Sequence, residues 1–318
     1  MIIEMMYTIS IAIPVIMSAL GAGIGQGLIG MKSIEALHIQ PSASAEIRKV
    51  STIGLSFTET AAILGLVLSI MLYIDTTIPI SFYDAALGRI GISLAIGLSG
   101  FIAGITSSWP AQAACLSVAK QPFFSNKILQ LMLLTQTVIS TPNIFGFLIA
   151  LFIKAQIPFV SNTNQGLRLL AAGLSIGLGS IGPCIGLSAF AAAACTAIGI
   201  NRKSYSKILT FTFISEAIIE TPVLFSFIIS LLILSIKVNP EASIVQGIAF
   251  IAAAICMGLS TVGTGISTGI TGAAACNQIG IKPEEYSTIS NISLFSLAMI
   301  DTCAIYGFII SIMLIYSL

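Results

Sequence analysis

Long apolar stretches separated by short polar clusters occupy almost the whole chain. Several of them exceed the roughly 20 residues that a helix needs to cross the hydrocarbon layer of a membrane. The apolar segments run roughly over residues 7–37, 48–74, 86–119, 127–154, 166–200, 207–236, 243–278 and 286–318. Because lipid offers no hydrogen-bond partner to backbone groups, each segment is predicted to be helical. The pattern therefore predicts an all-α membrane protein with eight transmembrane helices.

The composition agrees with this pattern and excludes other classes. Of the 318 residues, 56% are hydrophobic and only 8% are charged, against about 25% charged in a typical soluble protein. An ordinary soluble domain and a disordered chain are both excluded. The net charge of +1 gives no basic surface for nucleic acid. Six cysteines in apolar segments and a single His provide neither a disulfide framework nor a metal site, so no cofactor is expected.

The distribution of basic residues predicts the orientation in the membrane. The turns after segments 1, 3, 5 and 7 hold nine basic residues, and the turns after segments 2, 4 and 6 hold four. The positive-inside rule then places the first set of turns in the cytoplasm and both termini outside, in a protein of the cytoplasmic membrane. The nine residues are Lys32, Arg48, Lys49, Lys120, Lys127, Arg202, Lys203, Lys207 and Lys282.

A short motif recurs at the same place in every even-numbered segment. Its four copies begin at positions 59, 140, 220 and 301, with spacings of 81, 80 and 81 residues. They begin Glu59-Thr60, Ser140-Thr141, Glu220-Thr221 and Asp301-Thr302. The chain is therefore predicted to be four tandem helical hairpins, and Ser140 replaces the acid in the second. The predicted hairpins span residues 1–80, 81–161, 162–241 and 242–318.

Glycines alternate along the odd-numbered segments in the same repeat register. In the first segment Gly21 and Gly25 share one helix face, and Gly23 and Gly27 share the adjacent face. Small residues let helix backbones approach closely, which is what drives helix packing in lipid. Close neighbours on two sides suit the inner helices of a tight ring.

Three acids stand near the middle of their predicted spans: Glu59, Glu220 and Asp301. Glu220 lies about 20 Å from Lys207 and about 25 Å from Lys237 along a helix axis. An ionised carboxylate at that depth costs at least about 2.5–3.5 kcal/mol. Since no Lys or Arg of the chain lies at this depth, the compensating partner is a bound ion, a proton or a residue of another subunit. Neutral acids that only hold helices together are the alternative reading.

Together these features resemble the proteolipid rotor subunit, called c or K, of the rotary ATPases of the V/A or F type. In that family an inner helix carries alternating glycines, and an outer helix carries a midmembrane acid. The resemblance covers essentially the whole chain, four times over. The turn Lys120-Gln121-Pro122 is also similar to the basic-Gln-Pro pattern of the family's cytoplasmic loop.

The resemblance implies a two-layered rotor ring, built from further copies of the chain in membrane lipid. Glu59, Glu220 and Asp301 would carry the ion as the ring turns, opposed by an Arg of a stator subunit. Central-stalk subunits would meet the cytoplasmic turns. The soluble partner subunits would hydrolyse or make ATP, so the chain itself is not an enzyme.

The transported ion is left as Na⁺ or H⁺. A proton needs only a carboxyl group, whereas sodium needs several oxygen ligands. In sodium-binding members of the family, a hydroxyl just after the acid and a Gln of the inner helix help. The candidates for these supporting ligands here are Thr60, Thr221, Thr302 and Gln26.

A further acid, Glu216, lies one helical turn before Glu220. It is expected either to supply an oxygen to the ion site or to donate a hydrogen bond while protonated; a packed neutral acid is the plain alternative.

Because hairpin 2 lacks an acid, the chain offers three sites over eight helices, which favours an ATP-driven pump over a synthase. Two other classes remain open from the sequence. One is a self-contained ion transporter or channel, and the other is a structural proteolipid without transport.

Overall fold

The computed structural model describes residues 2–75, 83–238 and 244–316, and their secondary structure is entirely helical. Eight helical spans are long and apolar enough to cross a membrane, which confirms the predicted fold class. The long helices are α1 (Ile2–Ile39), α2 (Ser44–Ile74), α3 (Tyr83–Thr106), α4 (Ser108–Lys120), α5 (Ser125–Gln156), α6 (Thr163–Gly179), α7 (Ile181–Ile200), α8 (Tyr205–Ser235), α9 (Val245–Ile281) and α10 (Tyr286–Tyr316). Short 3-10 turns cover Pro41–Ala43, Pro122–Phe124, Ile157–Phe159, Arg202–Ser204 and Pro283–Glu285.

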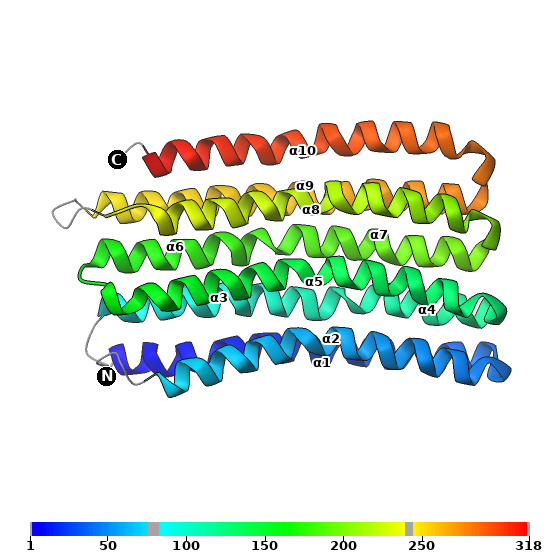
Figure 1. The fold of residues 1–318 in the computed structure, drawn as a ribbon, viewed down its shortest axis with the longest axis horizontal. Helices are drawn as coiled ribbons and strands as arrows, with labels where there is room; N and C mark the ends of the chain where they lie inside the picture. Colours follow the sequence, from blue (N-terminus) through cyan, green and yellow to red (C-terminus); the bar gives the residue numbers. More distant parts are fainter. Residues whose placement is uncertain (1, 76–82, 239–243, 317–318) are drawn as a thin grey trace.

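The spans form four hairpins that lie side by side in chain order (Figure 1). The hairpin turns gather at one end of the molecule, and the start of α1 and the end of α10 lie at the other. One row of spans contains α1, α3–α4, α6–α7 and α9, which pack extensively on each other; α2, α5, α8 and α10 form a second, looser row. We call these the inner and outer rows. The predicted hairpin boundaries after residues 80 and 241 lie outside the described residues.

Two inner spans are divided in a way that the hydrophobic pattern does not predict. The third span breaks at Ser107 between α3 and α4, and the fifth breaks at Ser180 between α6 and α7. Each break lies three residues before a proline, Pro110 or Pro183, which has no N–H for the carbonyl four residues earlier. Helices α5 and α8 continue through their own prolines. Proline alone therefore does not explain the two breaks. The pairs Ser107-Ser108 and Gly179-Ser180 contribute to them, because pairs of glycine and serine are common at helix kinks.

Glycines allow the backbones of neighbouring inner spans to touch. A Cβ atom added to Gly25 would clash with the carbonyl oxygen of Gly104, and one added to Gly186 would clash with that of Gly265. Gly173 lies against Gly91 in the same way. The predicted close packing is therefore present between hairpins 1 and 2, 2 and 3, and 3 and 4.

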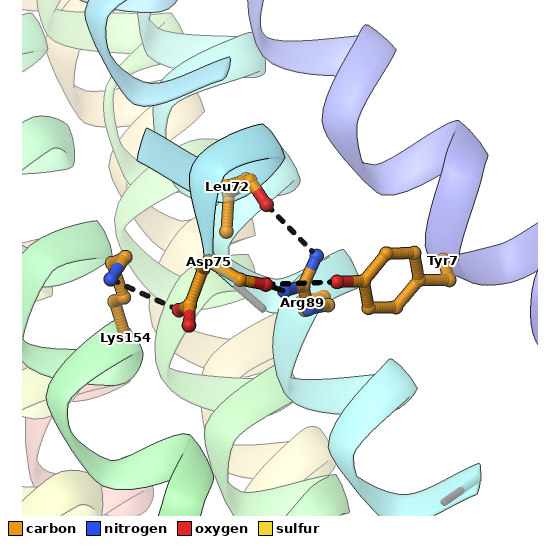
Figure 2. Close-up of polar contacts among 5 residues, drawn as sticks. All are labelled: Tyr7, Leu72, Asp75, Arg89 and Lys154. Atoms are coloured by element: carbon orange, nitrogen blue, oxygen red, sulfur yellow. Dashed lines mark hydrogen bonds and ion pairs between the residues drawn. The ribbon is translucent and has the colours of Figure 1, made fainter. Parts of the chain in front are cut away.

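A buried arginine ties hairpin 1 to hairpin 2 at the end away from the turns (Figure 2). Arg89 of α3 is 1% exposed and donates to the carbonyl oxygens of Leu72 and Asp75 at 3.4 Å each. Its guanidinium also lies 3.7 Å from the ring centre of Tyr7, and Lys154 pairs with the Asp75 carboxylate at 3.0 Å. The last carbonyls of a helix lack partners within the helix, so Arg89 completes the end of α2.

Candidate ion-carrying site

The three midmembrane acids all lie on the outer row, one on each of three helices. Glu59 of α2 is exposed, whereas Glu220 of α8 and Asp301 of α10 are half-buried. The structure therefore keeps the three carboxyl groups on separate helices, at the same repeat position, and does not bring them together. Glu59 differs from the others because α2 is the first helix of the outer row and has no preceding neighbour within the chain.

The carboxyl group of Glu220 faces the neighbouring hairpin. The side chain of Thr141 in α5 lies against it, and the Thr141 hydroxyl donates to the Thr137 carbonyl of its own helix at 3.5 Å. Thr141 follows Ser140, at the repeat position of Thr60, Thr221 and Thr302. The hydroxyl that reaches this acid thus comes from the preceding hairpin, a pairing that sequence reasoning missed. The repeat register identifies Thr141 as a site residue once this pairing between hairpins is known.

The other supporting candidates stay predictions, and the structure shows where their polar groups lie. Thr60 donates to the Phe57 carbonyl at 2.7 Å, Thr221 to that of Ala217 at 3.0 Å and Thr302 to that of Met299 at 2.7 Å. A hydroxyl that donates to its own helix keeps lone pairs for a cation or a neighbouring group. Gln26 is half-buried on α1, in the same hairpin as Glu59.

Asp301 of α10 stands at the repeat position of Glu220. Its Oδ1 atom is buried and has no hydrogen-bond partner among the described residues. By the repeat, Thr221 of α8 stands to Asp301 as Thr141 stands to Glu220. The unpaired carboxyl oxygen is therefore available to a bound cation, or to a proton.

Hairpin 2 has a hollow where the missing acid would stand. The hollow measures about 410 Å³ and lies between α2 and α5. Both Thr60 and Ser140 line it, which is the juxtaposition that Thr141 and Glu220 make one hairpin further along. The hollow is therefore the counterpart of the Glu220 site, without its carboxyl group.

Aromatic rings pair between the other two sets of neighbouring outer helices. Phe145 stacks on Phe227 between α5 and α8, with ring centres 4.7 Å apart, and Phe225 lies 5.1 Å from Phe308 between α8 and α10. At the corresponding place of α2 the chain has Leu64, which lines the hollow. The smaller side chain leaves the groove beside Ser140 open.

Helices α8 and α10 carry three acids, Glu216, Glu220 and Asp301, and Glu216 is the most buried of them. It is 2% exposed, and neither of its carboxyl oxygens has a hydrogen-bond partner in the described part of the chain. The structure thus places Glu216 inside the bundle, while Glu220 contacts Thr141 of the neighbouring outer helix.

Four repeated hairpins, three of which carry a midspan carboxyl group on the outer row, define a membrane proteolipid. The family profile of the ATP synthase C subunit matches the chain four times, over residues 9–72, 90–153, 170–233 and 251–314. The chain therefore belongs to the ATP synthase C-subunit family. It is a non-catalytic rotor subunit of the c or K class of rotary ATPases, with four repeats in one polypeptide.

Individual relatives agree with the family match. The chain is 28% identical over 230 residues to A-type ATP synthase subunit K of Methanocaldococcus jannaschii. The aligned region covers 72% of this chain and 95% of that protein. It is 38% identical over 69 residues to the ATP synthase c subunit of Chloroflexus aurantiacus, covering 22% of this chain and 91% of that protein. A 54-residue stretch is 46% identical to the ATP synthase c subunit of Mycoplasma mobile, covering 17% of this chain and 54% of that protein.

Proposed function

We propose that the chain carries H⁺ or Na⁺ across the membrane on Glu59, Glu220 and Asp301 as a ring of its copies turns. Ion movement is coupled to ATP hydrolysis or synthesis by partner subunits. The observation that carries this proposal is the contact between Glu220 and Thr141. It gives a midmembrane carboxyl group a ligand from the adjacent hairpin, and the repeat extends that arrangement around the outer row.

The two edges of the chain support closure with further copies. Gly23 and Gly27 of α1, and Gly263 of α9, have open space where a Cβ atom would lie. Inside the chain, the counterparts of Gly23 in hairpins 2 and 4 are Gly104 and Gly265, and both lie against the preceding hairpin. The exposed face of α1 is thus shaped to receive α9 of another copy.

Closure would also complete the site of Glu59. This acid is exposed on α2, and the neighbouring outer helix would come from another copy. By the repeat, Thr302 of that neighbouring copy stands to Glu59 as Thr141 stands to Glu220. One of the three ion sites is therefore shared between chains.

Two glycines of α1 provide a matched test of ring closure. We expect Gly23→Leu to leave the single chain folded but to prevent ring assembly, because the added side chain fills only the outer edge. Gly25→Leu is expected to push α1 away from α3 and destabilise the chain itself by about 1–3 kcal/mol or more. Native mass spectrometry gives the number of chains per particle, and thermal unfolding gives the stability of the chain. A Gly23→Leu variant that still forms a full ring would contradict this mode of closure.

The hairpin turns are proposed to face the cytoplasm and to contact the central stalk. A hollow of about 510 Å³ lies between the second and third turns, and its lining includes the cations Lys120, Arg202 and Lys203. Phe123 stands fully exposed beside them. Basic side chains around an exposed aromatic ring suit an acidic surface of a stalk subunit. The stator is proposed to supply the Arg that opposes reloading of the ion sites.

The alternative of a self-contained transporter or channel gains no support from the arrangement of the acids. A pathway within one chain needs polar groups that converge, and Glu59, Glu220 and Asp301 stand on three different helices of the outer row. The described inner row is instead packed through glycine backbones. Both features suit a rotor, in which each site faces the stator in turn.

Transport by the purified complex in vesicles tests the proposal and identifies the ion. ATP-driven uptake of radioactive sodium that persists with a protonophore would identify Na⁺. Acidification that a protonophore abolishes, without sodium uptake, would identify H⁺. A complex that hydrolyses ATP, contains the chain and moves neither ion would contradict the proposed function.

A further inference from the structure

Glu216 is a buried carboxyl group that the proposed ion path does not use. It lies in α8 one turn before Glu220, with 2% of its surface exposed and neither carboxyl oxygen hydrogen-bonded in the described part of the chain. An ionised carboxylate inside a membrane span is costly unless a cation or several donors compensate it. The protonation state of Glu216 therefore affects the stability of helix α8 beside the ion site.

No basic side chain in the described helices compensates Glu216. Lys207, nine residues earlier, lies about 14 Å away along the helix axis and donates to the Pro283 carbonyl at 2.6 Å. The helices packed on α8 carry their Lys and Arg residues only near their ends.

The titratable groups that face this part of α8 are also without positive charge. They are the thiols of Cys184 and Cys195 on α7, the thiol of Cys276 on α9 and the carboxyl of Glu220 itself. The side of α5 toward α8 contributes the neutral residue Thr141, which lies against Glu220. Ionisation of Glu216 would thus add a negative charge to a region that already contains acids.

Gln136 shows what the repeat position of Glu216 does in hairpin 2. Gln136 stands four residues before Ser140, as Glu216 stands four before Glu220. It is fully buried, and its Nε2 atom donates to the carbonyl oxygens of Ser107 at 2.9 Å and Gly54 at 3.4 Å. The donor thus ties α5 both to the break between α3 and α4 and to the outer helix α2.

A protonated Glu216 can also donate a hydrogen bond, whereas an ionised one cannot. Its O–H group is the single donor of the side chain, and carboxylate oxygens only accept. By the repeat, the carbonyl groups of Leu187 in α7 and Thr135 in α5 correspond to those of Ser107 and Gly54. From the repeat, we therefore expect backbone carbonyl groups within reach of a hydrogen bond donated by a protonated Glu216.

The hydroxyl groups around Glu216 also differ from those in hairpin 2. Ser188 of α7 and Ser215 of α8 are fully buried, and neither hydroxyl has a partner among the described residues. Their counterparts Ser108 and Thr135 donate to the carbonyls of Ile105 and Met132. Two hydroxyl groups without a partner among the described residues thus lie at the repeat level of Glu216, and a hydroxyl can accept from a protonated carboxyl group as well as donate to it.

We propose that Glu216 keeps its proton at every stage of rotation and acts as a positioning residue for Glu220. Its O–H group takes the role of the Gln136 amide and holds α8 against the neighbouring hairpin, where Thr141 meets Glu220. The inference rests on the proposed function, because it assigns transport in hairpin 3 to Glu220 alone. The chain then carries three ions, although it has four buried or midspan carboxyl groups on its outer row.

Infrared difference spectroscopy of the purified ring tests the protonation state directly. Subtracting the spectrum of Glu216→Gln from that of the unaltered ring is expected to show one protonated-carboxyl band. That band is expected to be the same at acid and alkaline pH and with or without sodium. Loss of the band at alkaline pH, or on addition of sodium, would overturn the proposal. The Glu220→Gln difference spectrum is the matched control, and its band is expected to respond to pH or sodium.

A pair of substitutions tests the positioning role. Glu216→Gln keeps an N–H donor, and Glu216→Leu introduces the residue that hairpins 1 and 4 have at this place, Leu55 and Leu297. We expect Glu216→Leu to lower the folding equilibrium constant of the chain by about fivefold or more, the size of a lost buried hydrogen bond, and Glu216→Gln to restore it. Equal stability of the two variants would refute the donor role. If the Glu216→Leu variant does not insert into the membrane, the infrared spectrum of the Glu216→Gln variant still tests whether Glu216 keeps its proton.

The two proposals fail in different ways. If Glu220 shows no response to pH or sodium and the complex moves no ion, the rotor account fails, whatever the state of Glu216. If transport and the Glu220 response are present but the Glu216 band titrates, only the positioning proposal fails.

Discussion

Glu220→Gln is expected to slow ATP-driven ion transport by roughly a hundredfold, whereas Asp301→Asn is expected to slow it by less than about tenfold. Each change removes one carboxylate, but the two changes differ in what lies next to the empty site. With Glu220 gone, hairpins 2 and 3 are consecutive hairpins without an acid, since Ser140 already replaces the first. With Asp301 gone, the two empty hairpins are separated by Glu220.

The size of the effect follows from the stator arginine that the rotor account requires. A charged Arg in the middle of a membrane without a partner costs about 2.5–3.5 kcal/mol, which corresponds to roughly a hundredfold in rate. Two successive hairpins without an acid leave the stator arginine without a carboxylate partner over a larger angle of rotation than one such hairpin does. Initial rates of ion uptake by vesicles, at equal amounts of assembled ring, give the comparison. Equal losses for the two variants would show that neighbouring sites do not matter. Glu59→Gln, which also creates two consecutive empty hairpins, is expected to resemble Glu220→Gln.

Ser140→Glu is expected to add a fourth ion site to each chain. The hollow of about 410 Å³ beside Ser140 provides room for the longer side chain. Thr60 lines that hollow, at the repeat position from which Thr141 reaches Glu220. The number of ions moved per turn would rise from three to four per chain. Because the work per ion grows with the membrane potential, the steepest gradient sustained by the same ATP supply would fall by roughly a quarter.

Ser140→Gln is the matched control, since it fills the hollow with a side chain of the same length that carries no charge. It is expected to leave the number of ions per ATP unchanged. The measurement is the membrane potential at which net ATP-driven transport stops. A Ser140→Glu complex that assembles, labels at residue 140 and stops at the unaltered potential would contradict the assignment of hairpin 2 as an empty carrier site.

Much of the fold could be predicted from the sequence because the membrane restricts the choices. Apolar segments of sufficient length have to be helices, and the spacing of the motif from Glu59 to Asp301 gives the four hairpins. The breaks at Ser107 and Ser180 were not predicted. Prolines also occur within the continuous helices α5 and α8, so proline alone does not identify a break.

The site was predicted less completely, because its contacts cross between hairpins. The pattern identifies Glu220 as an acid in a span, but it does not show which helix faces that acid. In the sequence a hydroxyl follows each acid directly, whereas the structure places Thr141 of the preceding hairpin against Glu220. The pattern does not predict the hollow at Ser140 for the same reason. The hollow is lined by Leu64 of α2, at the place where hairpins 2 and 3 have phenylalanine.

Carboxyl labelling of the intact complex with a hydrophobic carbodiimide, followed by peptide mass mapping, tests the central claim most directly. The account predicts label at Glu59, Glu220 and Asp301, and none in hairpin 2. Sodium that suppresses the labelling at fixed pH would make these sodium sites, whereas labelling that falls only as the pH rises would make them proton sites. No label at any of the three acids would contradict the account, because exposed ion-carrying carboxyl groups on the outer row would then be absent.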